Sequence, residues 1–127
     1  MSKGPEARFK TAINKLLPAE VYRQSMYTPY SGGTPDMYYE GPKGCLWVEY
    51  KFLTSLPATI DVKKILSPLQ NKWLQRANKN GIRCVVLIGY KKGGTWLYCD
   101  QAITKQVFFN LHETKKEIAR FITEEVI

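Results

Sequence analysis

The sequence predicts an α/β fold in which a central mixed β-sheet is flanked by helices. Three observations indicate this: two strand-like runs joined by a short turn, a strand–helix–strand order, and amphipathic segments near both ends. The 127 residues are 44% hydrophobic and 24% charged, as in an ordinary globular domain with a buried core. We therefore expect one α/β sandwich domain over residues 1–127.

The first half of the chain predicts a helix, a loop and a hairpin. Apolar residues recur at helical spacing over residues 5–17, with Pro5 at the start. Residues 21–35 are rich in Tyr, Ser, Gly, Thr and Pro, so we expect an extended loop. Residues 36–40 and 45–52 flank the turn-forming sequence Gly-Pro-Lys-Gly, which predicts an antiparallel hairpin.

A strong helix signal follows this hairpin. Residues 61–66 are consistent with either a short helix or a loop. Ser67 is a favourable N-cap, and Pro68 suits the first position of a helix that runs from 69 to about 80. Gly81 is typical of the residue just past a helix end.

The last third predicts two strands and a closing helix. Residues 82–89 are nearly all apolar, as in a strand covered on both faces. The strand–helix–strand order predicts that this strand lies parallel to strand 45–52. A further strand is expected over residues 95–99, after the Gly93-Gly94 turn, and an amphipathic helix over 113–126.

Composition restricts the classes of function. The chain has 19 Lys and Arg against 11 Asp and Glu, a net charge of +8, which suits an anionic partner such as nucleic acid. No apolar run is long enough for a membrane span and no signal peptide is evident, so we expect a cytoplasmic protein without a membrane partner. The three scattered cysteines are expected to be free thiols, and the single histidine, His112, cannot form a histidine-rich zinc site.

The hairpin places two acidic residues opposite each other. If Glu40 pairs with Cys45, then Asp36 lies opposite Glu49 on one face of the sheet. Like charges at directly opposite positions are destabilising, so a fold retains such a pair more readily when a cation lies between them. Lys51 returns to the face of Glu49 because side chains alternate along a strand. Two acids and one amine on one face are typical of a metal-dependent hydrolase.

This set of residues suits phosphodiester hydrolysis. Mg²⁺ prefers oxygen ligands, which Asp36, Glu49 and the backbone carbonyl of Tyr50 can supply. A bound cation offsets charge on the transferring phosphoryl group and lowers the pKa of the attacking water. Lys51 would orient or deprotonate that water, or stabilise the charge that develops.

These residues also resemble a known family. Pro35-Asp36 followed by Glu49-Tyr50-Lys51 resembles the signature of the PD-(D/E)xK nuclease superfamily. The run Gly-Thr-Pro-Asp that ends at Asp36 is similar to the start of this motif in the VRR-NUC branch and in phage and archaeal Holliday junction resolvases. The run Leu-Ser-Pro-Leu-Gln that ends at Gln70 is similar to the next helix of VRR-NUC domains, where a glutamine reaches towards the metal.

The resemblance implies a restriction-endonuclease-like sandwich with a Mg²⁺- or Mn²⁺-dependent DNA endonuclease site. It implies Asp36 and Glu49 as metal ligands, Lys51 and Gln70 as further catalytic residues, and an early-helix glutamate, for which Glu6 is the best match and Glu20 the alternative. The products would carry a 5′-phosphate and a 3′-hydroxyl. The expected substrate is branched DNA such as a Holliday junction or a flap, cut by a homodimer of bacteriophage or bacterial origin, in the host cytoplasm if phage-encoded.

Other interpretations of the same residues stay open. The fold could serve as a catalytically silent DNA-binding module, or as a nuclease acting on RNA or single strands. The basic residues of helix 69–80 either solvate that helix or contact DNA phosphates; they are Lys72, Arg76 and Lys79. Several tyrosines suit base stacking, a dimer contact or core packing; they are Tyr22, Tyr27, Tyr30, Tyr38 and Tyr39.

Overall fold

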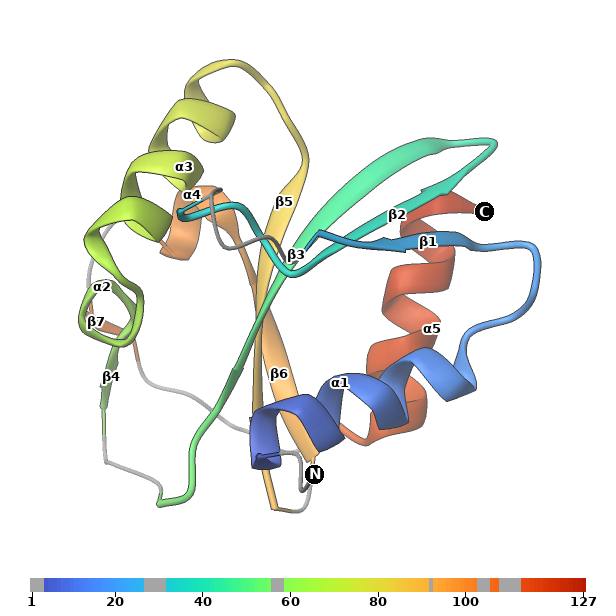
Figure 1. Ribbon diagram of the computed structural model, residues 1–127, viewed down its shortest axis with the longest axis horizontal. Helices are drawn as coiled ribbons and strands as arrows, with labels where there is room; N and C mark the ends of the chain where they lie inside the picture. Colours follow the sequence, from blue (N-terminus) through green and yellow to red (C-terminus); the bar gives the residue numbers. More distant parts are fainter. Residues whose placement is uncertain (1–3, 27–31, 56–58, 92, 103–105, 108–112) are drawn as a thin grey trace.

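The computed structural model describes residues 4–26, 32–55, 59–91, 93–102, 106–107 and 113–127. Its elements in chain order are α1 (Pro5–Leu16), β1 (Tyr22–Ser25), β2 (Met37–Gly41), β3 (Gly44–Phe52), β4 (Ile60–Asp61), α2 (Val62–Ile65), α3 (Pro68–Lys79), β5 (Cys84–Tyr90), β6 (Gly93–Tyr98), α4 (Cys99–Ala102), β7 (Gln106–Val107) and α5 (Lys115–Val126). A mixed five-stranded sheet in the order β1-β2-β3-β5-β6 has helices on both faces, which confirms the predicted α/β class (Figure 1). Strands β4 and β7 form a separate two-stranded sheet.

The predicted hairpin register is confirmed. Glu40 lies opposite Cys45, and the antiparallel pairing continues to Met37 opposite Val48. Gly44 has φ +128°, a conformation that a residue with a side chain rarely adopts, so the tight turn requires glycine there. The predicted parallel pairing of β3 with β5 is also confirmed, and it places β3 inside the sheet between β2 and β5.

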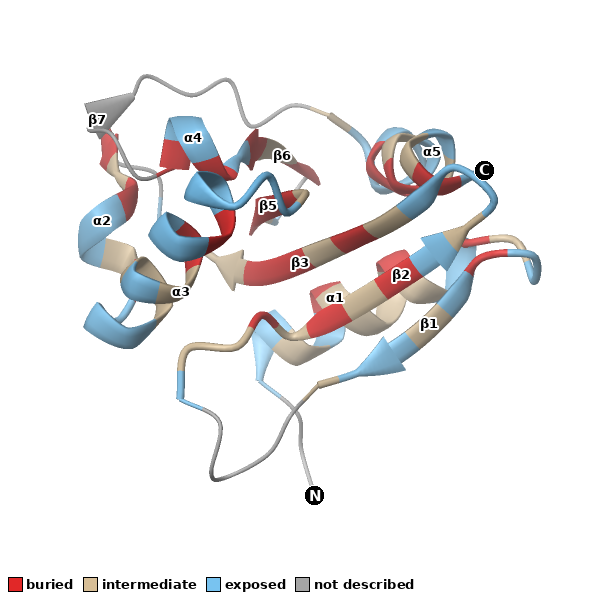
Figure 2. Cartoon of the chain, turned by 90° about the horizontal axis from the view of Figure 1, so that it is seen from above, coloured by how far each residue is buried: buried red, intermediate tan, exposed pale blue. Residues whose placement is uncertain are grey.

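Each face of the sheet has its own hydrophobic core. Helices α1 and α5 cover one face, while α2, α3 and α4 lie on the other side over β3, β5 and β6 (Figure 2). Alternate residues of β3 therefore enter different cores: Leu46, Val48 and Tyr50 pack towards α1 and α5. Glu49 and Lys51 consequently belong to the face that α3 covers.

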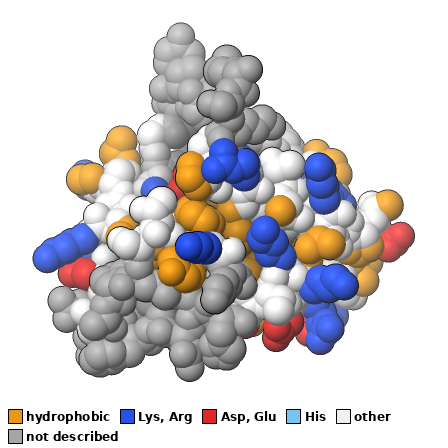
Figure 3. Space-filling view, turned by 90° about the horizontal axis from the view of Figure 1, so that it is seen from below, with side chains coloured by type: hydrophobic (Ala, Val, Ile, Leu, Met, Phe, Trp, Pro, Cys, Tyr) orange, Lys and Arg blue, Asp and Glu red, His pale blue; other side chains and the backbone are white. Residues whose placement is uncertain are grey.

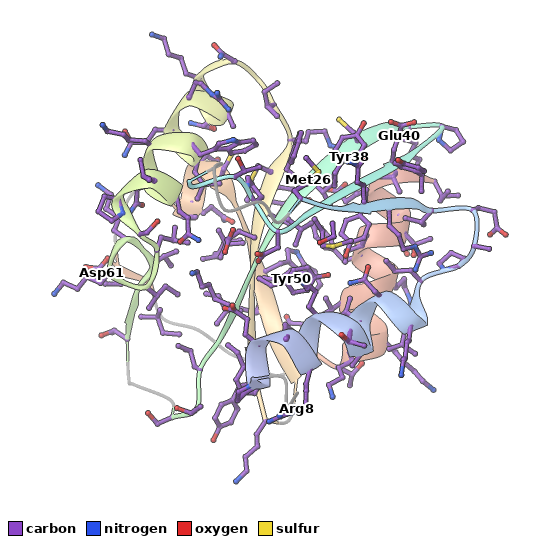
Figure 4. The ribbon with its side chains drawn as sticks, in the orientation of Figure 1. Arg8, Met26, Tyr38, Glu40, Tyr50 and Asp61 are labelled. Carbon is purple, nitrogen blue, oxygen red and sulfur yellow. The ribbon has the colours of Figure 1, made fainter. Side chains whose placement is uncertain are left out.

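The α1 face also contains a buried polar network. Tyr39 and Tyr50 are both fully buried, and their hydroxyl groups lie 2.8 Å apart. The Tyr39 hydroxyl donates to the Oδ1 of Asn14 in α1 at 2.8 Å, so Tyr50 donates to Tyr39. Tyr50 lies between the sheet and α1 (Figure 4). This network ties α1 to β2, which directly follows Asp36, and to β3, which carries Glu49.

The expectation of a continuous loop over residues 21–35 was wrong, because Tyr22–Ser25 forms the edge strand β1. Its residues are mostly exposed, so the strand carries no hydrophobic alternation that sequence could reveal. Arg23 stabilises it instead, since its guanidinium donates to the backbone carbonyls of Asn14, Pro18 and Val21. The open choice at residues 61–66 resolves into the short helix α2.

Smaller expectations were also decided. The three cysteines are free, as expected. The short helix α4, which was not predicted, begins at Cys99, the residue expected to end the last strand. Within the described residues, no helix is both long and apolar enough to cross a membrane. His112, Tyr27 and Tyr30 lie outside the described residues.

Candidate active site

Asp36 lies immediately before β2, and its carboxylate reaches across to β3. Its Oδ2 accepts a hydrogen bond from the backbone N–H of Tyr50 at 2.8 Å. Continuing the observed register by one residue places Asp36 opposite Glu49, as the sequence predicted. The N–H and C=O groups of one strand residue point to the same side, so the Tyr50 carbonyl is also directed towards Asp36.

The loop before Asp36 is held against the start of α3. Gly33 has φ +88°, and a Cβ atom there would lie 2.4 Å from the backbone oxygen of Leu69. Only glycine therefore permits this close approach of the loop to the helix. The contact brings the segment that ends in Asp36 close to Gln70, the next residue of α3. Sequence analysis matched this glycine to a motif but did not reveal its packing role.

Among the described residues, Glu49 is the one charged residue that is buried, with 3% of its surface exposed. Its Oε2 accepts a hydrogen bond from the Gln70 side-chain amide at 3.1 Å. The Lys51 ammonium lies 3.6 Å from the same oxygen. The other oxygen, Oε1, is buried without a hydrogen-bond partner. The structure thus brings Asp36, Glu49, Lys51 and Gln70 to one place.

Gln70 has a second role that the sequence analysis missed. Its side-chain Oε1 accepts from the backbone N–H of Ser67 at 2.8 Å, while the Ser67 hydroxyl accepts from the backbone N–H of Gln70. This reciprocal capping box starts α3, and its Ser-x-x-Gln spacing was visible in the sequence. The cap fixes the orientation of the amide, so its Nε2 is presented to Glu49.

Burial and like charge both act on Glu49. Burial, as the larger cause, and the negative charge of Asp36 together raise the pKa of Glu49 from 4.5 to about 8, while Lys51 opposes the change. The proton is retained because a buried carboxylate beside another carboxylate is costly to ionise. A divalent cation at this position would displace the proton and offset both negative charges.

Glu6 lies in the first turn of α1, within electrostatic reach of the same site. Desolvation raises the pKa of Glu6, with Lys51 lowering it and Asp36 raising it. Glu20 follows the opposite end of this 12-residue helix, so the two candidates are far apart. The geometry therefore favours Glu6 over Glu20 as the third acidic side chain near the site.

The donor set fits a magnesium-type ion. Within the described ranges, no cluster of three or more His, Cys, Asp and Glu side chains is close enough to bind a metal. Mg²⁺ usually needs only one or two carboxylates and completes its shell with water and substrate oxygens. Asp36, Glu49 with its unpartnered Oε1, and the Tyr50 carbonyl provide such a set.

The remaining candidates lie on α3 and on strands β1 and β2. Lys72, Arg76 and Lys79 are exposed on α3. The Arg76 guanidinium lies 5.1 Å from the centre of the Trp73 ring, a cation–π arrangement. Tyr39 is a core residue, whereas Tyr38 is half-buried and Tyr22 is exposed.

Comparison with known proteins does not assign the chain to a family. No protein-family model matches the sequence, and no curated protein matches it either. The resemblance to PD-(D/E)xK nucleases therefore depends on the short motifs and on the geometry of the residues that they contain.

Proposed function

We propose that this protein is a Mg²⁺- or Mn²⁺-dependent DNA endonuclease with a restriction-endonuclease-like fold. The observation that carries the proposal is the buried Glu49 carboxylate, which lies beside Asp36 and has one oxygen without a partner. Burying a carboxylate is costly unless it is paired or coordinates a metal. Lys51 contacts only one of its oxygens, at 3.6 Å, and a cation in place of the proton would pair the other oxygen and Asp36.

Each residue has a role in the proposed reaction. Asp36, Glu49 and the Tyr50 carbonyl would hold the cation, which offsets phosphate charge and acidifies the attacking water. Gln70 orients Glu49 through its amide. Lys51 positions or activates the water: the water oxygen bonds to phosphorus while the P–O3′ bond breaks. O3′ leaves with a proton, giving a 3′-hydroxyl and a 5′-phosphate.

Branched DNA is the proposed substrate. Nearly all the described elements form the sandwich itself, so the described part of the chain offers no separate element to read a sequence. Such an architecture suits recognition of DNA shape. We further propose a homodimer, which would present two sites to the two strands of a junction; a monomer in light scattering would contradict this.

The test is a cleavage assay with labelled Holliday junction, flap, single-stranded and duplex DNA, in Mg²⁺, Mn²⁺ or EDTA. Asp36→Asn should lower the rate about a thousandfold or more, because it removes a metal ligand. Lys51→Ala should lower it by about 10²–10⁴-fold. Asp61→Asn is the matched control, since Asp61 caps α2 away from the site (Figure 4).

The outcomes separate the alternatives. Cutting that survives Asp36→Asn or Lys51→Ala would refute the proposed site. Metal-dependent cutting of RNA alone would identify an RNA nuclease. Binding of DNA without cutting in any metal would favour a catalytically silent DNA-binding module.

A further inference from the structure

A second feature lies beside the proposed active site, at the end of the sheet where α1 begins. It is a pocket of about 440 Å³, within the range of sites that bind small molecules. Phe9 of α1, Phe52 at the end of β3 and Tyr90 at the end of β5 supply its aromatic lining. We name it the strand-end pocket.

The aromatic floor of the strand-end pocket is rigidly built. Phe9 is buried, and its ring centre lies 5.9 Å from those of Phe52 and Tyr50. A Cβ atom at Gly89 would lie 2.6 Å from the Phe9 ring, so the ring rests directly on the β5 backbone. The floor is therefore a fixed apolar surface that a ligand would find already formed.

The rim of the pocket is positively charged. Arg8, Lys91 and Lys115 come from three different segments and all line the opening. All three are exposed, and no Asp or Glu is among the described residues that line the pocket. Figure 3 shows Lys and Arg side chains around an exposed hydrophobic area on this end of the molecule. Arg8 lies at the lower end of the molecule in Figure 4.

The strand-end pocket lies at the end of β3 that follows Lys51. Phe52 packs on the α1 face, whereas Leu53 and Tyr90, which also line the pocket, pack against the core on the α3 face, the face of Glu49 and Lys51. Phe9 lies one helical turn after Glu6 on α1. The distance along β3 from Glu49 to Phe52 is about 10 Å, from the usual rise per strand residue. A nucleic-acid strand that binds at Glu49 and runs along β3 in this direction would reach the pocket.

We propose that the strand-end pocket binds one unpaired nucleotide of the DNA substrate, next to the bond that is cut. The aromatic floor would take the base, and the basic rim would take the phosphates on either side of it. Aromatic surfaces stack on any base, and cations follow the backbone, so this recognition is independent of sequence. The inference rests on the proposed function and narrows its substrate to DNA with an unpaired segment beside the scissile phosphate.

The test compares two flap substrates that differ only in their bases. One labelled duplex carries an ordinary single-stranded flap, and the other carries a flap of abasic nucleotides with the same phosphates. Binding is measured by fluorescence anisotropy in EDTA, so that no cutting occurs. The full-length protein should bind the ordinary flap about tenfold more tightly, which is within the range known for base–aromatic stacking.

Two variants examine the two halves of the pocket. Tyr90→Ala should abolish most of the tenfold preference and leave binding of the abasic flap unchanged. Lys91→Ala should weaken binding of both flaps and reduce the slope of log affinity against log salt concentration by about one. Lys43→Ala is the matched control, because Lys43 lies in the β2–β3 turn at the opposite end of the sheet (Figure 1).

The results separate this inference from the proposed function. Equal binding of both flaps by the unmodified protein would overturn the proposal that the pocket binds a nucleotide. The same holds if the slope of log affinity against log salt concentration is equal for Lys91→Ala and Lys43→Ala. Lys91 is exposed, so this variant tests the rim even if Tyr90→Ala unfolds the protein. Cleavage is measured separately with Mg²⁺: absence of cutting would overturn the nuclease proposal, while the anisotropy results still decide the pocket.

Discussion

Replacing Glu49 with glutamine should remove a pH-dependent loss of stability from the metal-free protein. Burial, together with the charge of Asp36, raises the pKa of Glu49 from 4.5 to about 8. Between these values the folded protein binds more protons than the unfolded chain, so the free energy of unfolding falls as pH rises. The difference between the two pKa values corresponds to about 5 kcal/mol of the free energy of unfolding. This contribution is retained below pH 4.5 and fully lost above pH 8.

The assay is urea unfolding in EDTA at pH 4.5 and pH 8.5. From pH 4.5 to pH 8.5, the free energy of unfolding should fall by several kcal/mol more in the unmodified protein than in Glu49→Gln. This difference is a large part of the usual stability of a domain. Any constant effect of the substitution on packing or on the Gln70 hydrogen bond cancels in this comparison. Glu40→Gln is the charge control: it removes an exposed carboxylate from β2, and the glutamine oxygen can still accept the hydrogen bond from the Tyr38 hydroxyl.

Magnesium provides the second half of this test. A ligand that binds only the folded state stabilises it, so Mg²⁺ at pH 8.5 should raise the stability of the unmodified protein. The Glu49→Gln variant should gain much less. If both proteins lose the same stability between pH 4.5 and 8.5, the reasoning about the buried carboxylate is refuted.

Two further predictions concern the support around this carboxylate. Gln70→Leu should weaken metal affinity by about 10–100-fold, because loss of a hydrogen bond to a metal ligand typically has this effect. The measurement is the Mg²⁺ concentration that gives half-maximal cleavage. Ser67→Ala should cost about 1 kcal/mol by removing the hydroxyl from the helix cap. It should leave the Mg²⁺ requirement unchanged, because the Ser67 backbone N–H that orients the Gln70 amide remains. Equal effects of both variants on that requirement would contradict a role for the amide at Glu49. Tyr39→Phe should lower the free energy of unfolding by about 1–3 kcal/mol, because it leaves buried partners including Tyr50 unsatisfied, and an unchanged urea midpoint would count against that network.

Local signals explain what the sequence could predict. The hairpin register follows from the length of the Gly-Pro-Lys-Gly turn and from strand alternation, so the position of Asp36 opposite Glu49 could be inferred. The helix that carries Gln70 was predicted from its cap. Both signals lie within a few residues of the feature that they specify.

Features that depend on distant segments could not be predicted. Strand β1 lacks alternation because it lies at an exposed edge and is held by Arg23. Glu49 is buried because α3 covers one side of β3. Glu6 lies near the proposed active site because of the way α1 packs on the sheet. The strand-end pocket combines residues from α1, two strand ends and α5, which no local pattern relates.

The central claim is that Asp36 and Glu49 hold one divalent cation. Its most direct test is a crystal structure of the protein grown with Mn²⁺, examined for anomalous scattering. The account predicts a peak between the two carboxylates, within about 2.5 Å of an oxygen of each, with the Tyr50 carbonyl facing it. A well-ordered site without a peak at saturating Mn²⁺, or a peak bound elsewhere with Glu49 still paired only to Gln70 and Lys51, would contradict it.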